Sequence, residues 1–147
     1  MKASRVDYLV DAGPLVGAFW PADQWHLWSR QTLSAVGQRV FTTESVFAEA
    51  AYHLRTHPSA LYQLLAALES GLVEFMPILQ TDSGRAAEII HAYPRQGDWG
   101  DASLIILSER HPKARLITTD RRDFTVYRRR DGHPVPCLFP PVGRATA

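Results

Sequence analysis

Short β-prone runs alternate with longer helical patterns along this chain of 147 residues. This alternation is typical of parallel sheets, because a parallel connection needs a crossover long enough to hold a helix. The sequence therefore predicts an α/β fold with a mainly parallel sheet flanked by helices. The predicted strands are residues 6–10, 39–42, 72–76 and 115–118, with two shorter candidates at 126–127 and 136–139.

Apolar side chains recur at helical spacing between these runs. In the segment that begins at Thr43, for example, Val46, Phe47, Ala50 and Leu54 share one face of a helix. Proline and glycine residues mark the boundaries of several such segments. We expect helices at residues 14–20, 23–36, 43–54, 60–69, 84–93 and 101–110.

The composition fits a single globular domain. With 46% hydrophobic residues and a net charge of +1, the chain is too apolar and too nearly neutral to be disordered. Its length matches the commonest domain size. We expect one domain over residues 1–141 and a loose C-terminal tail at residues 142–147.

Cys137 is the single cysteine, so the chain has no disulfide framework and a reducing compartment is the simplest context. No apolar run approaches the ~18 residues of a membrane span, and the first residues lack the apolar core of a signal peptide. We therefore expect no membrane association and a cytoplasmic location.

The near-zero net charge hides two opposed segments. Residues 1–109 hold 7 Lys or Arg against 12 Asp or Glu, whereas residues 110–147 hold 9 against 3. Only Lys2 and Lys113 are lysines, so nearly every cation is a guanidinium group suited to phosphate. The basic segment is compatible with an anionic partner and equally with a general enrichment in arginine.

Two aspartates follow predicted strands directly: Asp11 follows the first, and Asp120 follows the run at 115–118. Ligands of parallel sheets bind at this carboxyl edge. Glu49 and Asp101 lie on helices that can face the same edge. Four carboxylates would repel one another without a cation, so their convergence predicts a Mg²⁺ or Mn²⁺ site. No Cys/His cluster has zinc-ligand spacing.

Each acid also has a purely structural interpretation. Asp98 could cap a helix that has Asp101 in its first turn, and Asp120 with Asp123 could start a short turn or helix. Glu49 could simply face solvent. These alternatives stay open when each residue is considered alone.

In their order along the chain, these motifs resemble those of the PIN-domain ribonucleases, in particular VapC-like toxins. The resemblance extends from Tyr8 to Pro141. The matching segments are Val10-Asp11-Ala12-Gly13-Pro14-Leu15, Asp23 with His26, Thr43 with Val46, Glu49-Ala50-Ala51, Gly71-Leu72, Asp98-Trp99-Gly100-Asp101-Ala102-Ser103-Leu104, Thr118-Thr119-Asp120-Arg121-Arg122-Asp123-Phe124 and Leu138-Phe139-Pro140-Pro141.

The resemblance implies a PIN-like three-layer fold and assigns roles by position. The family's metal-binding and catalytic acids match Asp11, Glu49, Asp101 and Asp120. Auxiliary acids match Asp98 and Asp123, and Thr118 matches a hydroxyl position often found near the site. One departure is Ala12-Gly13, where many members place Thr or Ser after the first aspartate.

The implied activity is Mg²⁺- or Mn²⁺-dependent hydrolysis of RNA phosphodiester bonds by an endoribonuclease. A VapC-like protein would be the toxin of a type II toxin–antitoxin pair, with a cognate antitoxin and a homodimeric assembly. The alternative is a non-catalytic PIN-like module that binds RNA or protein. Candidate contacts to the RNA backbone are Arg121, Arg122, Arg128, Arg129 and Arg130, which could instead form solvated turns.

Tryptophan side chains could stack on bases. Helical spacing favours packing for Trp25 and Trp28, whereas Trp99 lies between two candidate site acids.

Two other magnesium-binding α/β classes fit poorly. A haloacid-dehalogenase-type phosphatase needs a second aspartate two residues after Asp11, and a receiver domain needs a lysine after a late strand.

Overall fold

Five strands form one sheet in the computed structural model, which describes residues 5–142, and every neighbouring pair of strands is parallel. The order across the sheet is β3-β2-β1-β4-β5. The strands are β1 (Tyr8–Val10), β2 (Val40–Thr42), β3 (Val73–Phe75), β4 (Arg115–Ile117) and β5 (Cys137–Leu138). The predicted parallel α/β architecture is confirmed.

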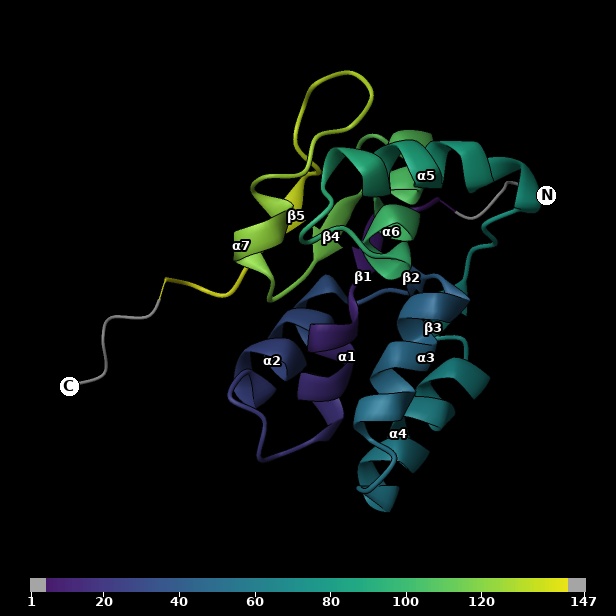
Figure 1. The fold of residues 1–147 in the computed structure, drawn as a ribbon. Coiled ribbons are helices and arrows are strands. Elements are labelled where there is room, and N and C mark those ends of the chain that lie inside the picture. Colours follow the sequence, from purple (N-terminus) through teal and green to yellow (C-terminus); the bar gives the residue numbers. More distant parts are fainter. Residues whose placement is uncertain (1–4, 143–147) are drawn as a thin grey trace.

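Helices flank this sheet, with α1 to α4 in the lower part of Figure 1 and α5 and α6 in the upper part. Helix α1 packs against α2, α3 and α4, while α6 contacts both α5 and α3. The α-helices are α1 (Ala12–Phe19), α2 (His26–Val36), α3 (Glu44–His53), α4 (Pro58–Glu69), α5 (Ser83–Ala92), α6 (Trp99–Arg110) and α7 (Arg121–Phe124); a 3₁₀ turn, η1 (Gln80–Asp82), precedes α5.

The strand order reverses at β1. The chain lays β2 and β3 on one side of β1 and then returns to the other side for β4 and β5. The carboxyl ends of β1 and β4 are neighbours, since Val10 pairs with Ile117. Ligands of open α/β sheets bind where the order reverses in this way. Asp11 and Asp120 follow these two strand ends.

Helix α6 is buried on all sides through its middle. Its residues from Ala102 to Ser108 are all buried, and Leu104, Ile105 and Leu107 are fully inaccessible. A helix that is apolar all round is enclosed by the core. Its first turn, at the carboxyl edge of the sheet, is therefore firmly anchored.

The strand predicted at residues 126–127 is wrong. These residues follow α7 in a turn, where the backbone N–H groups of Val126 and Tyr127 both donate to the Asp123 carbonyl. Val126 is about half exposed while Tyr127 is fully buried. One exposed and one buried residue in succession also occur in a strand, so two residues alone cannot distinguish a strand from a turn. The strand predicted at 136–139 is present as β5.

The tail predicted at residues 142–147 falls, apart from the exposed Val142, outside the described residues. None of the helices within residues 5–142 has the length and apolar character needed to cross a membrane.

Candidate metal centre

Asp11 occupies the junction between β1 and α1. Its Oδ1 accepts a hydrogen bond from the Ala12 N–H at 2.8 Å, so it caps α1. Its Oδ2 accepts from the Thr118 hydroxyl at 2.7 Å, and the Thr118 oxygen in turn accepts from the Asp120 N–H at 3.0 Å. Thr118 thereby ties the loop after β1 to the loop after β4. The Asp11 side chain is buried.

Asp101 enters the site from the first turn of α6. Asp98 caps this helix, because its Oδ1 accepts from the Asp101 N–H at 2.8 Å. The hydroxyl of the fully buried Tyr127 donates to Asp101 Oδ2 at 2.6 Å. One oxygen of Asp101 is thus fixed by the protein itself.

The third part of the site is α7. Asp120 caps this short helix through a bond from the Asp123 N–H to Asp120 Oδ1 at 3.0 Å. One carboxylate oxygen from each of Asp101, Asp120 and Asp123 lies within 4.8 Å of the other two. The capping interpretation is therefore correct for Asp98 and Asp120, and the same caps bring the carboxylates together.

Glu49 lies at the rim of the site, on α3. Its side chain is 49% exposed, and its Oε1 is 3.9 Å from His53 Nε2. A Cβ placed on Gly100 would lie 3.8 Å from Glu49 Oε2 and 3.5 Å from Asp98 Oδ1. Glu49 is exposed, as the structural interpretation expected, and it also faces the first turn of α6.

The pKa of Asp11 is raised to about 6, mainly by burial and to a smaller extent by the charges of Glu49 and Asp120. The hydrogen bonds from Thr118 and Ala12 act in the opposite direction, because they stabilise the ionised form. Glu49 itself has a pKa raised by partial burial and then by the charge of Asp98.

Asp101 has the most strongly perturbed carboxyl group of the site. Burial raises its pKa to about 8; the hydrogen bond from Tyr127 lowers it, and the charges of Asp98, Asp11 and Asp120 raise it. Asp123 also has a raised pKa, from burial and the charge of Asp120. These carboxyl groups are mutually destabilising when ionised, which is the condition that a bound cation relieves.

The donor set suits a hard divalent cation. The clustered groups are carboxylates, and Mg²⁺ and Mn²⁺ prefer oxygen ligands. Zinc sites use Cys and His ligands, which this cluster lacks among the described residues. The residues present therefore fit the predicted Mg²⁺ or Mn²⁺.

Sequence analysis missed two contributors to the site. Tyr127 was assigned to a strand, and nothing in its neighbourhood indicates that it reaches Asp101. Thr119 lies against Gly13, where an added Cβ would overlap its hydroxyl group. The space after the first aspartate, where the family often has a hydroxyl, is thus filled by a hydroxyl from the loop after β4.

The predicted arginine contacts separate into two groups. Arg129 is largely withdrawn from solvent: its side chain is only 9% exposed, and its guanidinium donates to the carbonyl oxygens of Ser108 and Pro112. Arg130 forms an ion pair with Glu88 at 3.5 Å. Arg129 thus holds the 128–133 segment against the body of the protein, whereas the Arg130 side chain is exposed and makes only a surface ion pair.

The remaining arginines are exposed at or near α7. Arg121 donates to the Pro140 carbonyl at 2.7 Å and lies over the Phe139 ring. Arg128 donates to carbonyl oxygens of the turn after α7. Arg122 is beside the cluster, where its charge acts to lower the pKa of Asp123.

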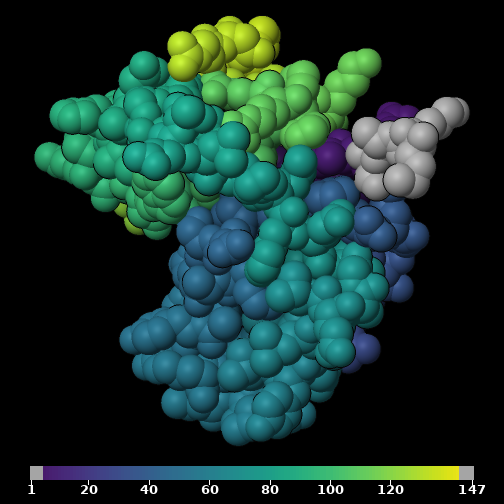
Figure 2. Space-filling model, turned by 90° about the vertical axis from the view of Figure 1, so that its right-hand side faces the viewer, coloured from purple at the N-terminus to yellow at the C-terminus, as the bar shows by residue number. Residues whose placement is uncertain are grey.

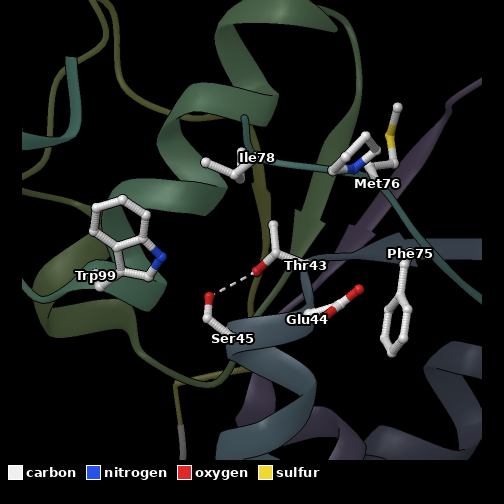
Figure 3. A pocket seen from close by; sticks show the side chains of 8 residues that line it. Thr43, Glu44, Ser45, Phe75, Met76, Ile78 and Trp99 are labelled. Atoms are coloured by element: carbon white, nitrogen blue, oxygen red, sulfur yellow. Dashed lines mark hydrogen bonds between the residues drawn. The ribbon is translucent and has the colours of Figure 1, made fainter. Parts of the chain in front are cut away.

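Two hollows flank the acids. One, of about 450 Å³, is lined by Gly13, Trp20, Trp25, Glu49 and His53 among others. The second, of about 280 Å³, lies between the start of α3, the segment after β3 and Trp99 (Figure 3). Figure 2 shows the outline of the molecule indented between the blue lower half and the teal and green upper half.

The chain is similar to known proteins in sequence pattern and in fold. A model of the PIN domain family matches residues 8–130. VapC20 of Mycobacterium tuberculosis, described as a toxin that cleaves the sarcin–ricin loop, superposes with a TM-score of 0.65 at 15% identity, over 75% of this chain and 87% of that one. PAE2754 of Pyrobaculum aerophilum gives a TM-score of 0.50 at 18% identity, over 80% and 84% of the two chains. No curated protein matches the sequence.

Proposed function

Because this chain belongs to the PIN domain family, we propose that it is a divalent-metal-dependent endoribonuclease. The observation that carries the proposal is the group of carboxylate oxygens from Asp101, Asp120 and Asp123 within 4.8 Å of one another, at the sheet edge where Asp11 is buried. Phosphodiester hydrolysis needs an activated water and neutralisation of charge on the phosphoryl group. A bound Mg²⁺ or Mn²⁺ supplies both.

In this proposal Asp101 and Asp120 hold the metal together with Asp11, which lies outside the group of clustered oxygens that Asp123 completes. The surrounding hydrogen bonds fix the orientation of these ligands. Thr118 orients Asp11 and also binds the backbone of Asp120. Tyr127 orients Asp101 from the opposite side. Outer hydrogen bonds of this kind hold metal ligands in the geometry that the ion requires.

Glu49 is suited to accept the proton of the attacking water. Its carboxylate is about half exposed and its pKa is raised by partial burial and by Asp98, so it is a stronger base than an ordinary glutamate. His53 Nε2 lies 3.9 Å from Glu49 Oε1, at the same rim of the site. We assign Glu49 the role of general base, or of ligand to a metal-bound water.

The RNA backbone would approach along α7. Arg122 is exposed beside Asp123, where a guanidinium can pair with a phosphate that flanks the one being cleaved. Arg121 and Arg128 are exposed on the same segment. These contacts would give affinity that falls with salt, without selecting a base sequence.

We further propose that the protein is the toxin of a type II toxin–antitoxin pair, that it works in the cytoplasm as a homodimer, and that an antitoxin binds it. The support is the structural likeness to VapC20, itself a toxin. Growth arrest on expression, relieved by a small protein encoded next to this chain, is the expected result.

A cleavage assay on a structured RNA tests the nuclease proposal. Cleavage should require Mg²⁺ or Mn²⁺ and stop in excess EDTA. Asp11→Asn should reduce the rate by more than about 100-fold, because even outer hydrogen-bond partners of metal ligands contribute 10–100-fold. Glu69→Gln, an exposed acid at the end of α4, is the control and should cleave normally.

Equal cleavage by Asp11→Asn and the unaltered protein, or cleavage in EDTA, contradicts the proposal. Absence of both cleavage and Mn²⁺ binding by calorimetry would instead favour the non-catalytic binding module.

A further inference from the structure

The hollow shown in Figure 3 lies beside the metal centre and has no role in the chemistry described above. Trp99 forms one wall, Phe75, Met76 and Ile78 lie across from it, and Thr43 and Ser45 stand between them. Its volume is about 280 Å³. Clefts for drug-sized ligands start near ~300 Å³, so this hollow has room for one planar ring system.

The hollow is joined to the metal centre through the first turn of α6. Trp99 stands between Asp98, which caps α6, and Gly100, whose α-carbon faces Glu49. The Ser103 hydroxyl donates to the Gly100 carbonyl at 2.6 Å and lies 2.9 Å from Thr43 Oγ1. The first turn of α6 thus lies between the hollow and the acids, and an RNA strand whose phosphate is held at the acids has to pass this turn to place its neighbouring base in the hollow.

The indole of Trp99 is an unusual surface group for this site. It is 46% exposed, although large aromatic side chains are mostly buried. Figure 3 shows its ring turned toward Thr43 and Ser45. An exposed indole beside a nucleic-acid site is a stacking platform, since every base has a π face.

The polar wall of the hollow presents hydrogen-bond acceptors. Because the Ser103 proton is donated to Gly100, the contact with Ser103 uses the Thr43 proton. The Ser45 hydroxyl, 3.0 Å from Thr43 Oγ1, then donates to Thr43 and keeps its own lone pairs available. The exposed Glu44 adds a carboxylate. Acceptors pair with the amino groups on the edges of adenine, cytosine and guanine, whereas uracil has no amino group and offers only its ring N3–H as a donor.

We propose that this hollow binds one base of the RNA strand next to the cleaved phosphate, stacked on Trp99, and that it favours bases that carry an amino group over uracil. The assignment rests on the proposed function, because the acids must hold the phosphate that positions the base. It deepens that function by naming a base-selective subsite.

Binding of short single-stranded RNA to protein labelled with ¹⁵N in its indole groups tests the assignment without any cleavage. Hexamers of adenosine, cytidine and uridine are titrated in Ca²⁺, and the Trp99 indole signal is identified by its loss in Trp99→Phe. The Trp99 signal should move with the adenosine and cytidine hexamers and move less with uridine.

Affinity for the same hexamers gives the second measurement. Trp99→Ala should weaken binding of the adenosine and cytidine hexamers by about ten-fold, the order expected for loss of one stacked base, and Trp99→Phe should restore most of it. Glu44→Gln should narrow the difference between these hexamers and uridine. Tyr62→Ala, which removes an exposed ring on α4, is the control and should bind normally.

A Trp99 signal that stays still while a hexamer binds overturns the assignment, as does Trp99→Ala with unchanged affinity, or failure of every hexamer to bind. Normal RNA binding by Trp99→Ala together with loss of a protein partner would assign the hollow to that protein instead. Cleavage in Mn²⁺ is measured separately. If the Trp99 signal moves but no RNA is cleaved, the base subsite is supported and the nuclease proposal is refuted. If RNA is cleaved but neither the Trp99 signal nor the Trp99 variants show an effect, the nuclease is supported and the subsite is refuted.

Discussion

Tyr127 has one hydroxyl proton and two acceptors within reach, Asp101 Oδ2 at 2.6 Å and the Gln96 carbonyl at 3.1 Å. Its ring is held edge-on between Tyr93 and Phe124, with centroid distances of 5.0 and 5.1 Å. The ring cannot follow the carboxylate if the latter turns. Tyr127 therefore fixes one oxygen of Asp101, and in the proposed metal site it acts as a positioning residue that leaves the other oxygen for the ion.

Tyr127→Phe should weaken Mn²⁺ binding by about 10-fold or more, as is usual for outer partners of metal ligands. The ring and its packing remain, so the fold is kept. Titration calorimetry measures the affinity directly. Tyr93→Phe removes the hydroxyl of the neighbouring ring, which accepts from the Arg128 N–H, and should bind Mn²⁺ normally. Equal affinities of the two variants would show that the Tyr127 hydroxyl has no positioning role.

Helices α1 and α2 pack closely because Gly17, at their contact, has no side chain. A Cβ on Gly17 would lie 2.5 Å from Ser29 Oγ and 3.1 Å from Asp23 Oδ2. Ser29 is fully buried on α2, and Asp23 holds the Trp25 N–H at 2.9 Å, so neither can move freely. Since Asp11 caps α1, this contact also supports the candidate metal centre.

Gly17→Ala should lower the free energy of unfolding by about 1–3 kcal/mol, the usual cost of overpacking. The matched control is Gly84→Ala in α5, where an added Cβ meets nothing within 4 Å. That change should be neutral or stabilising by up to about 1 kcal/mol, because alanine favours helix. Thermal denaturation compares the two. An unchanged melting temperature in Gly17→Ala would contradict the close packing.

Local patterns were sufficient for most elements. Helix caps such as Thr43 and Asp98 depend on neighbours within three residues, so the sequence shows them directly. The turn at Tyr127 could not be predicted, because its ring packs against Tyr93, far away in the chain. The burial of Arg129 could not be predicted for the same reason, since its carbonyl partners lie near the end of α6.

In the candidate site, too, the residues that depend on local patterns could be predicted and those that depend on the packing of distant elements could not. Asp11 and Asp120 could be placed because they directly follow strands whose parallel pairing the pattern implies. The position of Glu49 beside Gly100 depends on how α3 packs against α6, which no local pattern specifies. The hydroxyl bridge from Thr118 to Asp11 likewise joins residues that meet only in the folded sheet.

For the molecule as a whole, the acid cluster should make the free energy of unfolding depend on pH and, if the proposed site binds it, on Mn²⁺ or Mg²⁺. Folding raises the pKa of Asp11 to about 6 and that of Asp101 to about 8, mainly by burial. Between about pH 4 and these values the folded protein holds more protons than the unfolded chain. Stability contributed by these groups is therefore present at low pH and is lost as the pH rises through the folded pKa values.

In EDTA, these groups should make the protein more stable at pH 5 than at pH 7.5, by about 1.4 kcal/mol for Asp11 alone. Asp11→Asn, which cannot ionise, isolates this contribution and should flatten the dependence. Mn²⁺ should raise the melting temperature more at pH 7.5 than at pH 5, because protons compete for the same oxygens. If the free energy of unfolding changes with pH in the same way in both proteins, burial does not raise the pKa of Asp11.

The strand order also sets the moment at which the site can exist. The ribosome makes β1, β2 and β3 first. Strand β4, the neighbour of β1 on the other side, begins more than a hundred residues after β1 ends, and Thr118 and Asp120 follow it. Until then Asp11 lacks the hydroxyl that orients it. A chain still attached to the ribosome, surrounded by RNA, is thus unable to assemble the metal centre until most of its length has been made.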